Sequence, residues 1–296
     1  MTARREALTT LGLVGPATLA MVVLIFLPVA MVAVLSFSDY QFGARSLNWV
    51  GIDNYRTLFI DPQARRAVTN TLIYAAVVIP GACILGLLAA LGLHGLAARA
   101  PRVAAVLRAA YFLPVAATLV AMAVAWQMLL HPNLGLVNQM LALVGVPGQR
   151  WLSDRALVIY TLAVIGIWQS LGYAMVLFLA GLAAIPQHLY DAAEVDGAGA
   201  GWERFWTVTW PMLGPTTLFV LVITATGAFR AFETVATLTK GGPAFASDVL
   251  VYAMYREGFV YFKAGYSAAI TMVFFALTLA VTALKFRVLE RRVHYR

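Results

Sequence analysis

The sequence has few charged residues and almost no cysteine. Asp, Glu, Lys and Arg make up 11% of its 296 residues, whereas 62% of the residues are hydrophobic. Soluble proteins carry about 25% charged residues, so the composition indicates an integral membrane protein. The single cysteine, Cys83, excludes an internal disulfide bond, and its apolar neighbours do not favour a reactive thiolate.

Motifs for enzyme chemistry are missing as well. The chain has no G-x-x-x-x-G-K-S/T loop to hold nucleotide phosphates, so it cannot hydrolyse ATP by that route. No Ser-His-Asp arrangement, paired carboxylates or His/Cys cluster stands out, and His94 and His131 lie near the ends of apolar segments. We therefore expect a protein that is not an enzyme and has no catalytic residues, no metal site and no cofactor in this chain.

The net charge of +8 does not indicate nucleic acid binding. The basic residues lie in short loops and at both ends of the chain, where membrane proteins normally carry them. We expect membrane lipid, and not nucleic acid, around this protein.

Long uncharged segments dominate the sequence. Each holds about 20 or more mostly apolar residues, enough to cross a hydrocarbon core of about 30 Å. We therefore predict an all-α membrane protein with six transmembrane helices, in the segments Ala7–Ser38, Ala67–Ala98, Ala109–Gln149, Ala156–Tyr190, Phe205–Phe229 and Ala264–Leu284.

Two of these segments need comment. The third is interrupted by His131-Pro132-Asn133, and its second part, Leu134–Val146, has a length that fits an interfacial helix better than a span. The first segment follows two arginines, as a signal peptide would, but it is too long for one and lacks a clear cleavage site. We expect it to be the first span.

Six spans place both termini on the same side of the membrane. Both flanks are basic, which predicts a cytoplasmic location by the positive-inside rule. The basic residues are Arg4 and Arg5 at the start and Lys285, Arg287, Arg291, Arg292 and Arg296 at the end.

A polar stretch, Leu189–Pro215, separates two of the apolar segments. It contains Asp191, Glu194, Asp196 and Glu203, four of the 13 acidic residues in the chain. We predict two short helices, Gln187–Val195 and Gly201–Val208, joined by a glycine-rich elbow. The predicted orientation places the stretch in the cytoplasm. Because it has four acids and one base, Arg204, the anionic inner leaflet should repel it, and a protein partner with basic groups is expected.

The same stretch carries a family signature. The run D191-A-A-E-V-D-G197-A, followed by Phe205 and Pro211, resembles the EAA loop of the permease subunits of bacterial ABC importers, and most closely that of the carbohydrate-uptake subfamily. Asp191 stands where the family usually has Glu, and Val208 replaces the usual Ile. Further matches to this family extend along nearly the whole chain: WVGIDNY (49–55), NTLIY (70–74), TKGGPAFASDVLVYAMYREGF (239–259) and FRVLERRVHY (286–295). The YREGF end of the third match and the fourth match resemble the glycerol-3-phosphate permease subunits in particular.

The resemblance implies an architecture and a set of partners. It implies the type I ABC importer permease fold in the bacterial cytoplasmic (inner) membrane, with both termini cytoplasmic. Residues 1–66 would form the first transmembrane helix and an exterior loop, and residues 67–296 a five-helix core with a coupling loop at 187–215. The implied partners are a second homologous permease subunit, two ATPase subunits that bind ATP and Mg, and an extracytoplasmic solute-binding protein.

The resemblance also assigns roles within the coupling loop, which in this family docks on the ATPase. Asp191, Glu194 and Asp196 would make polar contacts with the ATPase, and Gly197 would form the elbow. Phe205 and Trp206 would form the hydrophobic plug. The motif positions Ala192, Ala193 and Pro211 complete the assigned set.

Arg230 is the most conspicuous charge within a predicted span. A charged residue in a membrane helix usually faces a cavity or pairs with a neighbour, and in related sugar permeases this part of the fifth span lines the solute site. A guanidinium there could grip phosphate or sulfonate. It could equally pair with Glu233, one helical turn away, or extend towards the interface. Both interpretations stay open here.

Several uncharged residues are further candidates for the solute pathway. The polar ones could bond a hydroxylated solute and the aromatic ones could stack on a sugar ring, but each is equally plausible as helix packing. They are Gln127, Gln169, Thr226, Trp168, Tyr173 and Phe229, and Arg230 and Glu233 complete the set predicted for the pathway. Together with Arg230 and the family match, they suggest a sugar-like solute with an anionic group, such as glycerol-3-phosphate, a glycerophosphodiester or a sulfonated sugar.

Other classes of protein compete with this interpretation. A secondary transporter would normally need carboxylates within the membrane for ion coupling, and Glu233 is the single candidate. A membrane-embedded enzyme would need a catalytic constellation. An ABC importer for peptides or ions is disfavoured by the subfamily motifs alone.

Overall fold

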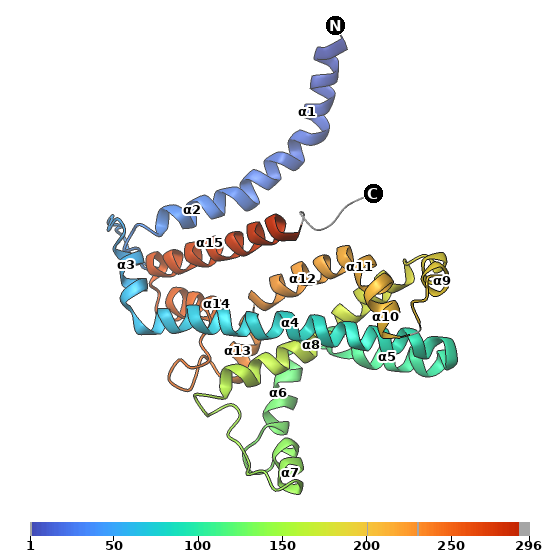
Figure 1. The fold of residues 1–296 in the computed structure, drawn as a ribbon. Coiled ribbons are helices and arrows are strands. Elements are labelled where there is room, and N and C mark those ends of the chain that lie inside the picture. Colours follow the sequence, from blue (N-terminus) through green and yellow to red (C-terminus); the bar gives the residue numbers. More distant parts are fainter. Residues whose placement is uncertain (1, 200, 230, 290–296) are drawn as a thin grey trace. The chain divides into compact units, whose positions relative to one another are not determined.

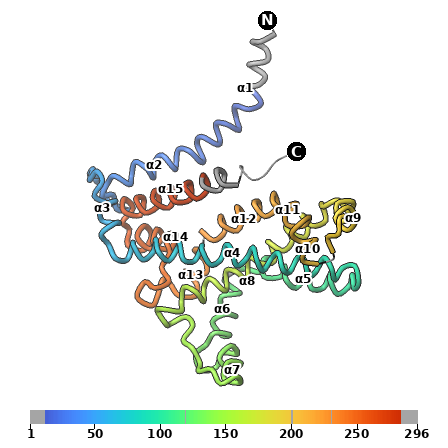
Figure 2. Tube along the Cα trace, viewed as in Figure 1, coloured from blue at the N-terminus to red at the C-terminus, as the bar shows by residue number. Residues whose placement is uncertain are grey.

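The structure is a computed structural model, and it describes residues 2–199, 201–229 and 231–289. These residues form helices joined by turns, and the only β pairing among them is an isolated bridge between Ser38 and Trp49. The chain divides into two compact units. One contains Met1–Arg65 and Ala253–Leu277, and the other contains Arg66–Tyr252 and Thr278–Arg296. Figures 1 and 2 trace the helices along the chain.

The first unit begins with one long apolar segment and ends in the last helix. From Gly12 to Leu35, nearly all side chains of this segment are exposed or partly exposed, as expected of a segment that faces lipid or another membrane subunit. The elements that begin in this unit are α1 (Thr2–Met21), a π-helical turn η1 (Val22–Phe26), α2 (Leu27–Leu35), α3 (Asp53–Ile60), a second π turn η3 (Arg256–Val260) and α15 (Ala264–Leu289).

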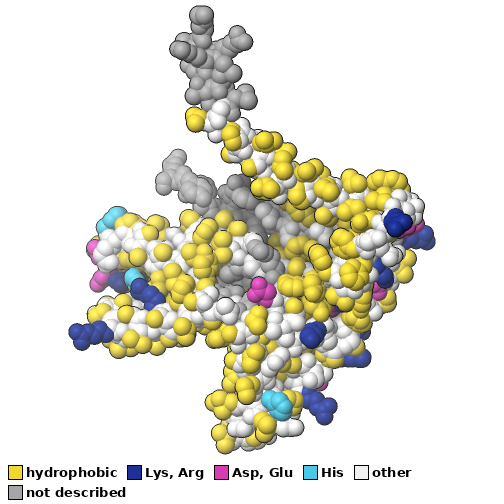
Figure 3. All heavy atoms as spheres, turned by 180° about the vertical axis from the view of Figure 1, so that it is seen from behind, with side chains coloured by type: hydrophobic (Ala, Val, Ile, Leu, Met, Phe, Trp, Pro, Cys, Tyr) yellow, Lys and Arg dark blue, Asp and Glu magenta, His cyan; other side chains and the backbone are white. Residues whose placement is uncertain are grey.

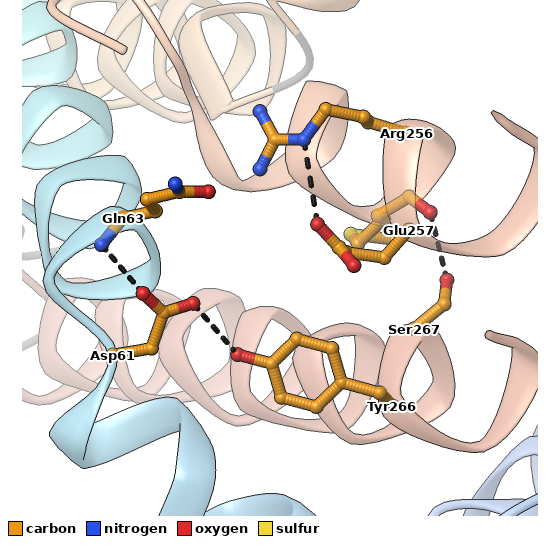
Figure 4. A network of polar contacts seen from close by, with 7 residues as sticks. Asp61, Gln63, Arg256, Glu257, Tyr266 and Ser267 are labelled. Atoms are coloured by element: carbon orange, nitrogen blue, oxygen red, sulfur yellow. Dashed lines mark hydrogen bonds and ion pairs between the residues drawn. The ribbon is translucent and has the colours of Figure 1, made fainter. Parts of the chain in front are cut away.

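A polar network ties these elements together within the unit (Figure 4). Asp61, directly after α3, accepts hydrogen bonds from the backbone N–H of Gln63 at 2.9 Å and from the hydroxyl of Tyr266 at 3.4 Å. Arg256 and Glu257 are both buried and form an ion pair at 3.4 Å. Because the buried charges are paired, the network can hold the ends of α3 and α15 together without an isolated ion in the interior.

The second unit contains the remaining spans. Its elements are α4 (Pro62–Arg99, which begins in the first unit), α5 (Pro101–Ala116), α6 (Leu119–Leu129), α7 (Leu136–Leu143), α8 (Val158–Ala183), α9 (Gln187–Val195), α10 (Trp202–Arg204), the π turn η2 (Phe205–Thr209), α11 (Trp210–Met212), α12 (Gly214–Phe229), α13 (Phe232–Leu238) and α14 (Leu250–Tyr255, which ends in the first unit). Helix α8 packs against both α5 and α12, and α6 packs against α13.

Small residues allow α8 to approach its neighbours closely. At Gly172 an added Cβ would overlap the carbonyl oxygen of Tyr111 in α5, and at Gly86 it would lie 2.6 Å from the Cβ of Ala174. Close backbone approach through small residues is the usual way for helices to associate in lipid, where burying apolar side chains gains little. Figure 3 shows one face of the molecule, on which hydrophobic side chains predominate and charged side chains are few and scattered.

The structure confirms the predicted all-α class and most of the spans. Among the described residues, five helices are long and apolar enough to cross a membrane, and the pair α5 and α6 provides a sixth if it counts as one span. The side of the membrane on which each terminus lies stays a prediction.

The third span is where the sequence prediction was wrong in detail. It begins before the predicted Ala109, at Pro101, and α5 and α6 meet at an angle of 106°. Ala117 and Thr118 have extended backbone angles, which end the first helix and redirect the chain. The predicted interruption at His131-Pro132-Asn133 is present between α6 and α7. The helix predicted within Leu134–Val146 is α7; its interfacial location stays a prediction.

The fifth span, Gly214–Leu238, contains a residue with non-helical backbone angles. Helix α12 ends at Phe229, and Ala231 has φ −68° and ψ +47°, which is not helical, before α13 begins at Phe232.

Candidate coupling loop and solute cavity

The polar loop, residues 187–215, begins with the predicted helix. Helix α9 occupies Gln187–Val195, the predicted bounds, and is followed by Gly197 with a φ of +85°. This left-handed conformation suits glycine and allows the Ala198 N–H to donate to the carbonyl of Ala193 at 2.9 Å, which closes the end of the helix. The assignment of Gly197 to the elbow is consistent with this backbone geometry.

The second half of the loop extends further than predicted. It starts after Gly201, whose φ is +91°, and passes through α10, η2 and α11 to Met212, four residues beyond the predicted end at Val208. Its middle turn is π-helical, a geometry that often marks functional sites.

Arg204 joins the two halves of the loop. Its guanidinium lies 3.2 Å from a carboxylate oxygen of Glu194 and 5.6 Å from the centre of the Tyr190 ring. The Tyr190 hydroxyl is in turn 3.2 Å from that of Thr209. Across the elbow, the Gly199 N–H donates to a carboxylate oxygen of Glu203 at 3.0 Å. Sequence reasoning assigned Glu194 to a partner and missed this internal ion pair.

The other predicted polar residues remain available at the surface. Asp191 accepts a hydrogen bond from the side-chain amide of Gln187, one turn earlier in α9, at 3.3 Å. Asp196 and Ala192 are exposed, as is Pro211. Asp191 and Asp196 are therefore accessible acidic groups on one small loop.

Four aromatic rings form an exposed group in the second half of the loop. Trp206 lies 5.4 Å from Trp202, 5.2 Å from Phe205 and 5.9 Å from Trp210 between ring centres. Trp202 is 72% exposed and Trp206 48% exposed. Phe205 and Trp206 were predicted from the family motif, whereas Trp202 and Trp210 were not. The spacing of the three tryptophans by four residues, which places them on one helix face, could have identified them.

The buried side of the loop belongs to the core of the spans. Ala193 of α9 and Val208 of η2 lie in the same hydrophobic cluster as Leu93 of α4, Leu182 of α8 and Val220 of α12. A displacement of the loop must therefore displace the ends of these helices, because close-packed side chains transmit movement and do not absorb it.

We expect the Arg204–Glu194 ion pair to contribute modestly to the rigidity of the loop. Exposed pairs typically contribute about 0–1 kcal/mol, so Arg204→Ala should accelerate amide hydrogen exchange between residues 197 and 203 a few-fold and leave the spans unaffected. The charge-swapped double variant Glu194→Arg with Arg204→Glu should restore protection. Equal exchange in Arg204→Ala and the wild type would contradict a role for the pair.

The second candidate site is a cavity of about 330 Å³ within the second unit. It lies beside Ala231, the residue between Arg230 and the start of α13. Its lining residues come from α4, α8 and the two halves of the fifth span: Tyr74, Val78, Gly166, Gln169, Ser170, Gly227, Ala228, Ala231, Glu233 and Thr234. Of the residues predicted for the solute pathway, Gln169 and Glu233 line this cavity.

The remaining predicted pathway residues have other surroundings. Trp168 packs edge-on against Trp126, with ring centres 5.4 Å apart. Gln127 donates to the carbonyl of Thr237 at 3.3 Å, and Thr226 donates to that of Val222 in its own helix at 2.8 Å. Phe229 is buried, whereas Tyr173 is partly exposed. Arg230 lies outside the described residues, and both interpretations of its role stay predictions.

Three polar residues of the cavity were missed by sequence reasoning. Tyr74, Ser170 and Thr234 line it, and Tyr74 and Thr234 are only 4% and 5% exposed. Tyr74 ends the family-like run NTLIY, and Ser170 adjoins Gln169, but neither signal indicates that α4, α8 and α13 bring these side chains together. The Tyr74 ring requires Gly166, where a Cβ would overlap the phenol oxygen and lie 3.0 Å from the ring carbon that carries it.

Comparison with known proteins agrees with the motif and the fold. The family model described as "Binding-protein-dependent transport system inner membrane component" matches residues 82–295. The sn-glycerol-3-phosphate transport system permease protein UgpA of Agrobacterium fabrum is 32% identical over 284 residues, covering 96% of this chain and 95% of the relative. UgpA of Brucella abortus is likewise 32% identical over 285 residues, covering 96% and 95% of the two chains.

Solved structures show the same fold. A bacterial alginate ABC transporter in complex with an alginate pentasaccharide-bound periplasmic protein contains a chain that matches with a TM-score of 0.79, at 22% identity, over 96% of this chain and 94% of that one. The family match and these relatives confirm the resemblance, including its type I importer fold class and its place in the inner membrane. The chain belongs to the family of inner membrane permease components of binding-protein-dependent transport systems.

Proposed function

We propose that this chain is the transmembrane subunit of an ATP-driven importer for a sugar or sugar-like solute. The named relatives are permeases for glycerol-3-phosphate, and the solved relative belongs to an importer of alginate, an acidic polysaccharide. Because the chain has no phosphate-binding loop, separate subunits supply the energy by binding ATP and Mg. The observation that carries the proposal is the polar loop, whose exposed side is acidic and aromatic and whose buried side is part of the span core.

The loop couples the ATPase to the spans in this proposal. Its exposed tryptophans enter a groove of the ATPase, and Asp191 and Asp196 meet basic groups at the rim. When the ATPase subunits close on ATP, the loop moves with them, and the cluster around Ala193 and Val208 carries that displacement to the ends of α4, α8 and α12. The loop lies on the cytoplasmic side, as the basic flanks of the chain predict.

The remaining partners follow from the same proposal. A second, homologous permease subunit completes the pathway, and an extracytoplasmic protein delivers the solute. Solute passes beside Ala231 of the fifth span, where the cavity offers hydrogen-bonding side chains.

Purification with the neighbouring gene products tests this function. We expect a tagged form of this chain to retain about two ATPase subunits per copy, and proteoliposomes of the complex to hydrolyse ATP faster when loaded binding protein is added. Vanadate should stop both hydrolysis and uptake. Uptake that follows a proton or sodium gradient without ATP would instead identify a secondary transporter.

A further inference from the structure

Another cavity, which we call the loop cavity, lies between the polar loop and the ends of the spans. It has a volume of about 400 Å³, which is within the range of about 300–1,000 Å³ usual for ligand pockets. Leu91 of α4 and Leu182 of α8 lie in one wall, and residues of α9, α10 and η2 form the other. A ligand in the loop cavity would therefore touch the loop on one side and the span ends on the other.

The polar side chains of the loop cavity are rich in hydrogen-bond donors. They are the guanidinium of Arg204, the imidazole of His94, the amide of Gln187 and the hydroxyls of Tyr190 and Thr209. The two hydroxyls are 3.2 Å apart and share one hydrogen bond, so one hydroxyl hydrogen is left for another acceptor. Among the described residues, none with a carboxylate lines the loop cavity. The arrangement favours a ligand that accepts hydrogen bonds.

Arg204 also has a donor without a partner in the described part of the chain. Its terminal nitrogen donates to a carboxylate oxygen of Glu194 at 3.2 Å, whereas its Nε is buried and forms no hydrogen bond with a described residue. Buried polar groups nearly always have a partner, and a buried donor of a charged group is costly to leave unpaired. The Glu194 carboxylate is 71% exposed, so solvent weakens its competition for the guanidinium. The Nε therefore requires water or an anion.

The acidic residues of the loop have other positions. Glu203 accepts a hydrogen bond from the Gly199 N–H across the elbow. Asp191 and Asp196 are exposed, and Asp191 accepts from the side-chain amide of Gln187, which keeps a second N–H for the cavity. Repulsion of an anion by these carboxylates acts through solvent, where screening is strong, whereas the guanidinium lines the cavity itself.

The donors match the oxygens of a phosphate group. A guanidinium presents its N–H groups in a planar fork that pairs with phosphate oxygens, and hydroxyl, amide and imidazole groups can each bond a further oxygen. Leu91, Leu182 and Phe205 add an apolar surface for the organic part of a phosphate ester. A carboxylate ligand has only two oxygens and would leave more of these donors unpaired.

We propose that the loop cavity binds the phosphate group of an organic phosphate, with Arg204 as its main contact, and that the bound phosphate holds the polar loop against the span ends. A soluble phosphate ester and the headgroup of a phospholipid present the same oxygens, and both belong to this class. The site goes beyond the import function, because the loop cavity shares no lining residue with the solute cavity among the described residues and requires no ATPase.

Amide hydrogen exchange of the full-length chain in phosphate-free maltoside micelles tests the proposal in two arms. One arm adds phenyl phosphate, with chloride at equal ionic strength as the reference, and the other adds phosphatidylglycerol to the micelles. A ligand slows exchange through openings that release it by a factor of 1 + [L]/Kd, so exchange between residues 197 and 209 should slow about tenfold at about ten times the Kd. Slowing by phenyl phosphate shows that a soluble ester can enter, and slowing by the lipid alone identifies a headgroup.

Two variants that break the same ion pair should respond in opposite ways. Arg204→Gln removes the guanidinium, so the ligand should no longer slow exchange, even though the loop itself exchanges faster. Glu194→Gln removes the competing carboxylate and keeps the guanidinium, so the ligand should act at an about threefold lower concentration. Arg155→Gln is the matched control and should respond as the wild type does. Arg155 is an exposed arginine before α8, whose 26 residues span about 39 Å between it and the loop cavity.

The proposal is overturned when neither ligand slows exchange in the wild type, or when Arg204→Gln keeps the full response. Loss of the response in Glu194→Gln would also overturn it, because the ion pair and not the anion would then control the loop. Should Arg204→Gln fail to fold, Tyr190→Phe takes its place. The loss of one hydroxyl should raise the required ligand concentration about fivefold, and an unchanged concentration would contradict the site. Retention of an ATPase does not enter these measurements, so this inference can fail while the importer function stands.

Discussion

Replacing Trp206 with alanine should weaken the association of this permease with its ATPase about 30-fold and reduce uptake accordingly. Trp206 is the centre of the exposed aromatic group, within 6 Å of Trp202, Phe205 and Trp210 between ring centres. Tryptophans at the centre of an interface commonly contribute about 2 kcal/mol or more to binding, which corresponds to the expected factor. Because Trp206 is not part of the buried cluster, the spans should fold as before.

The measurement is the amount of ATPase retained by the tagged permease at increasing salt and dilution. Phe219→Ala is a suitable control, since Phe219 is also an aromatic residue about half exposed, but it lies on α12 outside the loop. Retention of the ATPase by Trp206→Ala at the level of the control would place the hydrophobic contact elsewhere.

Replacing Gly172 with alanine should lower the free energy of unfolding of the second unit, because the added methyl group has no room between α5 and α8. The new Cβ would overlap the carbonyl oxygen of Tyr111 and lie 3.0 Å from its carbon and 3.1 Å from the Cα of Phe112. All three atoms belong to the backbone of α5, so α5 and α8 would have to separate along their contact. Overpacking of this kind costs about 1–3 kcal/mol, which should lower the melting temperature of the purified protein by several degrees.

Gly92→Ala provides the matched control for that experiment. Gly92 lies in α4, and an added Cβ there has no neighbour within 4 Å, so the variant should melt at the wild-type temperature or slightly above it. An unchanged melting temperature for Gly172→Ala would show that α5 and α8 can move apart at little cost.

The polar loop was the part of the chain most completely predicted from sequence. Acidic residues interrupt an otherwise uncharged sequence there, and glycines at 197 and 201 occupy the two left-handed positions. Both signals are local, so the bounds of α9 followed directly. The number of spans was predictable for a similar reason, because the cost of placing a charge in hydrocarbon limits each crossing to an uncharged segment.

Features that depend on contacts between helices were not predictable in the same way. The 106° bend between α5 and α6 falls within an uncharged segment, so no charged residue marks its position in the sequence. The cavity unites Tyr74, Ser170 and Thr234 from three helices, and only their packing places them together. The pairing of Glu194 with Arg204 likewise depends on the way the elbow folds back, which the family motif does not specify.

The contact between Gly166 and Tyr74 has a consequence for the evolution of this protein. The phenol oxygen occupies the volume that a side chain at 166 would fill, so the two positions cannot both be large. Among descendants of a common ancestor, a substitution at 166 should be accompanied by a shorter residue at 74, and the two columns of an alignment should covary. A lineage with a shorter residue at 74 would lose one hydroxyl from the wall of the cavity and would gain space at the same place. Selection for a new solute would therefore leave its trace at these two positions.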